Sequence, residues 1–177
     1  TNQPQLLFLT AAMAGACVGF IPHNIRRKKM FLGDAGSMFI GFVMAGVSLM
    51  GNWASQDIVK VSIPILILGV PIFDMTFTTI MRVAENKVHN VIEWLEYAGR
   101  DHFHHYLMDL GLKPGGAVVF IWMVNVSLGI SALLITKATD PLYGIVTIFK
   151  SMITFALIAV LMVLGKRLHQ EHEAQKI

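Results

Sequence analysis

An uncharged apolar run decides the fold class of this protein: GGAVVFIWMVNVSLGISALLIT, from Gly115 to Thr136. A helix that crosses a membrane needs about 20 mostly apolar residues, and this run meets that requirement. Four further stretches qualify, at residues 5–21, 37–53, 61–81 and 142–165. The sequence therefore predicts an all-α fold, a polytopic membrane helix bundle of about five transmembrane helices.

The composition supports a membrane protein. Of the 177 residues, 55% are hydrophobic and 14% are charged, and the mean hydropathy is +0.62. A soluble domain carries about 25% charged residues, so these numbers exclude a soluble globular enzyme, a nucleic-acid binder and a disordered region. The single cysteine, Cys17, excludes a disulfide framework and a cysteine-based zinc site.

Lysine and arginine residues predict the orientation in the membrane, because they gather on the cytoplasmic side. Eleven of the fourteen lie in the links after the first and third spans and in the C-terminal tail: Arg26, Arg27, Lys28, Lys29, Arg82, Lys87, Arg100, Lys113, Lys166, Arg167 and Lys176. The other three are Lys60, Lys137 and Lys150, the last inside the fifth span. We therefore expect the N-terminus outside and the C-terminus in the cytoplasm.

The long link at residues 82–114 is predicted to be a cytoplasmic loop with two short helices. Apolar residues spaced by three or four predict an amphipathic helix on the membrane face, closed by Gly99: Val88, Val91, Ile92, Leu95 and Ala98. Asp101 is expected to cap a second helix over His102–Leu110, which ends at Gly111.

Asp34 is the first candidate for chemistry. It lies between Gly33 and Gly36 at the start of the second span, next to the basic run at residues 26–29. A carboxylate at such a position suits Mg²⁺, which usually binds one or two carboxylates together with water and substrate phosphates. The alternative is that Asp34 caps the span and pairs with a neighbouring lysine or arginine.

Three histidines form the second candidate, in the run DHFHH at residues 101–105. On a helix, His102 and His105 share a face and His104 points elsewhere. Clustered imidazoles beside a carboxylate can bind a metal, contact phosphate or shuttle protons. A third feature is Asp74, a carboxylate inside the third span and three residues after Pro71, which we expect to kink the helix. Its role stays open between interhelical hydrogen bonding and a functional site.

Four short runs together resemble the polyprenyl-phosphate N-acetylhexosamine-1-phosphate transferases, also called glycosyltransferase family 4. They are GFIPHN at residues 19–24, FLGDAGS at 31–37, PIFD at 71–74 and DHFHH at 101–105. The resemblance implies Mg²⁺-dependent transfer of a sugar-1-phosphate, with Mn²⁺ as the alternative metal. The donor is a UDP-sugar, the acceptor is undecaprenyl or another polyprenyl phosphate, and UMP is released. It also implies a bacterial cytoplasmic (inner) membrane and a role in cell-wall or lipopolysaccharide synthesis.

The resemblance assigns roles to individual residues. Asp34 matches the metal-binding aspartate, and His102, His104 and His105 match the catalytic histidine motif. Phe31 matches the aromatic residue that stacks on uracil, Asn24 matches an asparagine of the nucleotide pocket, and Asp101 is added as a substrate-binding residue. The interrupted His-Phe-His-His run and the Pro-Ile-Phe-Asp of span three are typical of the GlcNAc-1-phosphate branch. Phospho-MurNAc-pentapeptide transferases, the alternative branch, have an unbroken histidine run.

One departure from the family concerns completeness. The family's Asp-Asp pair of an earlier cytoplasmic loop and its Asn/Asp-rich loop before the Phe-Leu-Gly-Asp run are not present in this sequence, and the family has about ten or eleven spans. We therefore expect the 177 residues to be one transmembrane region, the C-terminal part of a larger transferase domain, and to be inactive alone. The alternatives from other classes are an ion-coupled transporter and a non-catalytic membrane partner. The one protein partner suggested is a second copy of the chain in a homodimer, and no nucleic acid is expected to bind.

Overall fold

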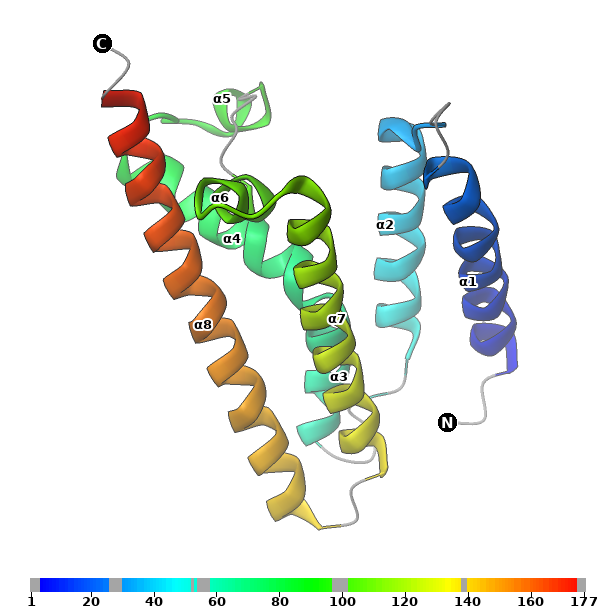
Figure 1. Cartoon of the computed structure of the whole chain (residues 1–177). Coiled ribbons are helices and arrows are strands. Elements are labelled where there is room, and N and C mark those ends of the chain that lie inside the picture. The colour runs from blue at the N-terminus through cyan, green and yellow to red at the C-terminus, as the bar shows by residue number, and fades with distance from the viewer. Residues whose placement is uncertain are drawn as a thin grey trace. The chain divides into compact units, whose positions relative to one another are not determined.

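A computed structural model describes residues 4–25, 30–51, 53, 58–96, 102–137 and 140–174. Regular secondary structure in these residues is helical, with no strand among them, which confirms the predicted all-α class (Figure 1). The chain divides into two compact units, residues 1–57 and 58–177. Each unit is described by itself.

The first unit consists of two apolar helices, α1 (Pro4–Ile25) and α2 (Gly33–Met50). Both are long and apolar enough to cross a membrane, as predicted for the first two spans. The second helix begins four residues before the predicted start at residue 37, so that Asp34 lies in its first turn.

The predicted third span is broken. It comprises a short 3₁₀ turn, η1 (Ile58–Val61), followed by α3 (Ser62–Ile67) and α4 (Gly69–Ala84). The two parts of the span are bent by 76°, so the prediction of one continuous helix is wrong, although the predicted proline kink is present. Proline has no N–H and its ring clashes with the carbonyl four residues earlier, which for Pro71 is that of Ile67, the last residue of α3.

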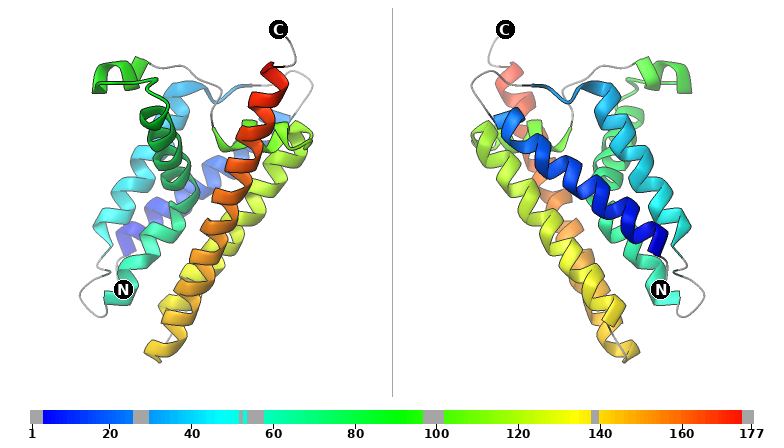
Figure 2. Two further views of the ribbon diagram at one scale, coloured as in Figure 1. Left: turned by 90° about the vertical axis from the view of Figure 1, so that its left-hand side faces the viewer. Right: turned by 90° about the vertical axis from the view of Figure 1, so that its right-hand side faces the viewer.

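A long helical hairpin forms the other part of the second unit. The helices α7 (Pro114–Lys137) and α8 (Pro141–Ala174) confirm the predicted fourth and fifth spans and run side by side (Figure 2). Apolar side chains from both helices are almost fully buried, namely Leu128, Ile135, Ile158 and Met162. By length and composition, four helices of the described chain qualify as membrane spans, or five if the bent pair counts as one. The protein is therefore a multi-pass membrane protein.

Two short helices occupy the predicted loop at residues 82–114, namely α5 (Val91–Glu96) and α6 (Phe103–Asp109). They lie at the same end of the second unit as the C-terminal end of α8 (Figure 1). The predicted amphipathic helix is shorter than expected because Asn90 caps it: the Asn90 side chain accepts the Glu93 N–H at 2.8 Å. Val88 lies before this cap and is buried, whereas Val91 and Ile92 are exposed. Ala98 and Gly99 lie outside the described residues.

Candidate functional site

In the first unit, the link between α1 and α2 is held at both of its described ends. The Asn24 side chain donates to the Met30 carbonyl at 3.1 Å, and the Met30 N–H donates to the His23 carbonyl at 3.3 Å. These bonds place Phe31 directly after the closed link, with 79% of its surface exposed. Asn24 therefore positions the segment that carries Phe31 and Asp34.

Asp34 presents an exposed carboxylate in the first turn of α2. Gly33 precedes it with a φ of +67°, a conformation that favours glycine. No side-chain hydrogen bond caps α2, and none of the hydrogen bonds or ion pairs between described residues involves the Asp34 carboxylate. Residues 26–29, the basic partners considered for Asp34, lie outside the described residues.

The exposed Asp34 carboxylate could serve as one ligand of Mg²⁺. Within the described ranges, no three His, Cys, Asp or Glu side chains converge on one point. Mg²⁺ tolerates this, because it commonly retains several waters and binds one or two carboxylates together with substrate phosphates. Asp34 is therefore suited to supply one such carboxylate.

In the second unit, Asp74 holds the start of the histidine motif. One carboxylate oxygen accepts the Phe103 N–H at 2.8 Å, and the other is 3.0 Å from Nδ1 of His102. Phe103 is the first residue of α6, so Asp74 caps this helix from a distance of 29 residues in the sequence. An ionised carboxylate can only accept hydrogen bonds, and opposite one the contact would use the Nδ1–H of His102. Asp74 therefore makes interhelical hydrogen bonds, one of the two roles left open for it, and these bonds are to the histidine motif.

The three imidazoles lie next to one another. The His104 ring is 4.0 Å from the His105 ring, and it stacks nearly parallel to the His102 ring at 6.4 Å. The prediction that His104 points elsewhere is wrong, because His102 is not helical: it is the N-cap of α6, with extended φ and ψ of −86° and 155°. The helix therefore begins at Phe103, and Asp101, the predicted cap, lies outside the described residues.

The C-terminal end of α6 has the predicted glycine stop. Gly111 has a φ of +95°, its N–H donates to the Met108 carbonyl at 2.9 Å, and the Leu112 N–H donates to the Leu107 carbonyl at 3.2 Å. This pair of bonds is a Schellman motif. Between its two ends, α6 buries Phe103, Tyr106 and Leu107, so the helix that carries the histidines is held by both caps and by packing.

A close backbone contact joins α6 to α8. A Cβ placed on Gly165 of α8 would lie 2.6 Å from the Tyr106 carbonyl oxygen and 2.8 Å from the Tyr106 Cβ. Only glycine permits this approach, so Gly165 helps to place the histidine motif. Sequence reasoning missed this residue, because nothing near position 165 indicates which segment will pack there.

Glu85 joins the end of α4 to α8 through an ion pair with Lys166, and it also pairs with Lys87 at 2.7 Å. Burial raises the pKa of Glu85, but the hydrogen bonds and charges of Lys166 and Lys87 outweigh burial and hold the pKa below its ordinary value of 4.5. This ion pair was not predicted from the sequence, since its members are far apart along the chain.

We expect the Glu85 pair to make stability depend on pH. Because the folded-state pKa is lowered, the stabilisation is fully present above pH 4.5 and is lost as the pH falls through the folded-state pKa. Between about pH 6 and about pH 3, thermal unfolding should show a larger stability loss for the wild type than for Glu85→Gln. The difference should be up to about 1 kcal/mol, the size typical of ion pairs near the surface. Glu171→Gln, an exposed change on α8, should behave as the wild type, and equal losses in all three proteins would contradict the assignment.

The Asp74 contacts predict a change in the His102 tautomer. In Asp74→Asn the amide oxygen can still accept the Phe103 N–H, while the amide nitrogen would donate to His102 Nδ1. The imidazole proton should then move from Nδ1 to Nε2, which ¹⁵N NMR of the labelled rings detects. Asp74→Ala removes both acceptors and should destabilise the protein by about 1–3 kcal/mol. Asp140→Asn, at the start of α8, is the control, and an unchanged His102 tautomer in Asp74→Asn would refute the contact.

Comparisons with known proteins agree on one family. Residues 1–52, which include Asn24, Phe31 and Asp34, match the model of glycosyl transferase family 4. The chain is 34% identical over 134 residues to the probable undecaprenyl-phosphate N-acetylglucosaminyl 1-phosphate transferase of Bacillus subtilis, covering 76% of this chain and 36% of the relative. It is 26% identical over 145 residues to the decaprenyl-phosphate N-acetylglucosaminephosphotransferase of Mycobacterium tuberculosis, covering 75% and 34%.

A shorter match reaches the other branch. Over 55 residues the chain is 43% identical to a phospho-N-acetylmuramoyl-pentapeptide-transferase of Synechococcus, covering 30% of this chain and 16% of the relative. No solved structure matches the chain significantly. The chain spans about a third of the length of the Bacillus and Mycobacterium relatives.

Proposed function

Since this chain belongs to glycosyl transferase family 4, we propose that it supplies catalytic residues for the transfer of a sugar-1-phosphate from a UDP-sugar to a polyprenyl phosphate. The names of its relatives describe this class of reaction, and we extend it to this chain because the chain belongs to the same family. The observation that best supports the proposal is that Asp74 holds the histidine motif in place. Asp74, a carboxylate of a membrane helix, uses both of its oxygens to hold His102 and the first amide of α6.

Phosphoryl transfer asks little covalent chemistry of a protein and depends on positioning and on charge stabilisation. An imidazole held through Nδ1 presents Nε2 on the opposite side of the ring, and His104 and His105 lie beside it. Three adjacent imidazoles at one end of a membrane bundle are suited to contact the phosphates of a nucleotide-sugar. The buried side of α6 keeps these rings in place while they act.

The remaining roles follow the family motif. Asp34 would hold Mg²⁺, whose charge would offset the negative charge of the phosphates. The exposed ring of Phe31 would stack on the uracil base, and Asn24, which closes the link before Phe31, would shape the nucleotide pocket. Asp101 is retained as a substrate contact.

We propose GlcNAc-1-phosphate as the transferred group and undecaprenyl phosphate as the acceptor. The longer of the matched segments belong to relatives whose names contain N-acetylglucosamine, whereas the match to a phospho-N-acetylmuramoyl-pentapeptide-transferase covers 55 residues. An isoprenoid acceptor lies in the lipid with its phosphate at the membrane surface. Because the lysine and arginine pattern predicts that the motifs face the cytoplasm, we place the reaction at the cytoplasmic face of the bacterial inner membrane.

The experiment is a segment replacement. The part of the Bacillus relative that aligns with this chain is exchanged for the 177 residues, and the purified product is assayed for UMP release. We expect UMP to appear only when UDP-GlcNAc, Mg²⁺ and undecaprenyl phosphate are all present. UDP-MurNAc-pentapeptide as the better donor would select the alternative branch. A replacement protein that is folded and membrane-inserted yet inactive with both donors would contradict the proposed function.

A further inference from the structure

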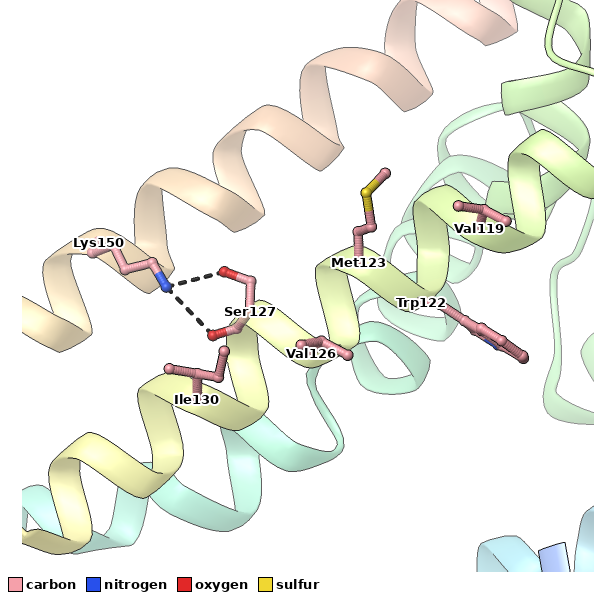
Figure 3. A pocket seen from close by; sticks show the side chains of 7 residues that line it. All are labelled: Val119, Trp122, Met123, Val126, Ser127, Ile130 and Lys150. Carbon is pink, nitrogen blue, oxygen red and sulfur yellow. Dashed lines mark hydrogen bonds between the residues drawn. The ribbon is translucent and has the colours of Figure 1, made fainter. Parts of the chain in front are cut away.

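Lys150 is a cation inside a membrane span. It lies nine residues into α8, and its ammonium group donates to the Ser127 carbonyl at 3.3 Å and to the Ser127 hydroxyl at 3.0 Å (Figure 3). It also donates to the Ser131 hydroxyl at 2.8 Å. All three acceptors are neutral. No ion pair among the described residues involves Lys150. Within that part of the chain, its contacts satisfy its hydrogen-bonding capacity without compensating its charge. Such a charge is costly in a membrane unless an anion pairs with it.

The Ser127 hydroxyl can also donate a hydrogen bond to an anion. It accepts from Lys150, and no hydrogen bond between described residues uses its own O–H as a donor. Ser131, by contrast, donates to the Ser127 carbonyl at 2.9 Å. A carboxylate at this point would therefore meet one free hydroxyl donor and one positive charge.

An exposed apolar groove continues from the lysine along α7. It has a volume of about 410 Å³, and five of its lining side chains are half exposed and lie on one face of the helix: Val119, Trp122, Met123, Val126 and Ile130 (Figure 3). Their spacing of three, four and seven residues is the pattern of a helix surface that packs against another helix.

The depth of the lysine selects the kind of anion. Ser131 lies six residues before the end of α7 and Lys150 lies nine residues after the start of α8, which places the ammonium about 9–14 Å below that end of the hairpin. The phosphate of a bilayer lipid lies outside the hydrocarbon core. A carboxylate on a neighbouring transmembrane helix can lie at this depth, whereas the phosphate of a lipid lies nearer the membrane surface.

This chain has no spare carboxylate for the purpose. Of its eleven aspartates and glutamates, only Asp74 lies in the interior of a predicted span, and both oxygens of Asp74 are already bonded to α6. A second copy of the chain is excluded as the partner for the same reason. We propose that the α7 groove and Lys150 form the docking surface for a transmembrane helix from outside these 177 residues, which carries one aspartate or glutamate at the depth of Ser127. The inference is independent of the proposed transferase activity.

The test uses synthetic single-span helices of leucine and alanine as probes. One probe carries a glutamate at the matching depth, a second carries glutamine there, and a third carries the glutamate at its end. Each also carries a cysteine that can form a disulfide with Val126→Cys in a Cys17→Ser background, in nanodiscs of zwitterionic lipid. We expect the first probe to cross-link about tenfold more than the other two.

Two variants make the result specific. Lys150→Met should reduce cross-linking of the glutamate probe to the level of the glutamine probe. Unchanged cross-linking of the glutamine probe would show that the variant still folds. Lys137→Met, at the end of α7, should preserve the preference. Equal cross-linking of both probes to the wild type, or a preference that persists in Lys150→Met, would overturn the proposal. A wild-type preference that disappears when the nanodiscs contain anionic phosphatidylglycerol would also overturn it, by identifying a lipid as the occupant.

Discussion

Asp34→Asn is expected to lower UMP release by the segment-replacement protein at least about 100-fold, the size of loss seen when one group that stabilises charge in the transition state is removed. Asparagine has nearly the same shape as aspartate, and no described hydrogen bond depends on the Asp34 carboxylate, so the fold should be unchanged. The loss would therefore come from the missing negative charge that would bind Mg²⁺. Initial rates over a Mg²⁺ titration provide the measurement, and excess metal should not restore the rate.

Asp140→Asn is the matched control for this experiment. Asp140 begins the segment that leads into α8, and its carboxylate accepts the Leu142 N–H at 2.9 Å. Asparagine serves this capping role as well as aspartate does, so both stability and activity should be retained. If Asp34→Asn keeps more than a tenth of the wild-type rate, the assignment of Asp34 as a metal ligand is wrong.

The second large effect is expected at Gly165, where alanine should destabilise the protein. The added Cβ would lie 2.6 Å from the Tyr106 carbonyl oxygen, and a backbone atom cannot move aside as a flexible side chain can. Overpacking of this kind costs about 1–3 kcal/mol, which exceeds the gain of up to about 1 kcal/mol from the better helix propensity of alanine. Thermal unfolding in detergent micelles, followed by circular dichroism, measures the change.

Gly129→Ala on α7 provides the comparison with the opposite expected sign. No atom lies within 4 Å of a Cβ placed on Gly129, so the helix-propensity gain should appear as equal or slightly higher stability. The displacement of α6 in Gly165→Ala should also disturb the His102 contact with Asp74, which the ¹⁵N signals of the rings would report. Equal stability of the two alanine variants would show that α6 and α8 do not approach as closely as the structure places them.

Several features could be predicted from local sequence because their causes are local. Apolar runs predict the membrane helices α1, α2 and α7 to within four residues at each end, whereas α8 continues nine residues beyond its predicted end at residue 165. Pro71 predicted a kink, although not that the helix would stop at Ile67, because the extent of a break depends on what packs at the corner: a Cβ on Gly69 would lie 2.6 Å from the Phe155 ring. Gly111 likewise predicted the end of α6, since a left-handed residue stops a helix regardless of its surroundings.

The arrangement of the candidate site required the tertiary structure. The sequence identified Asp74 and His102 separately, but could not pair them, because 28 residues and a helix end separate the two. The sequence also predicts the wrong relative positions of the three imidazoles. Helical spacing does not apply to His102, because the Asp74 contact holds this residue outside the helix. Gly165 and Glu85 carried no local signal, since their importance depends on which backbone or charge lies opposite them.

Local sequence was sufficient to predict an all-α membrane protein and to identify the family that its motifs resemble. Apolar length and short motifs are properties of contiguous residues, so they can be read without the fold. Three contacts depend on the packing of distant segments: a membrane carboxylate fixes the histidine motif, α8 leaves room for α6 at Gly165, and Lys150 with its neutral partners lies beside an apolar groove. Those contacts join residues distant in the chain, and the packing that creates them is cooperative.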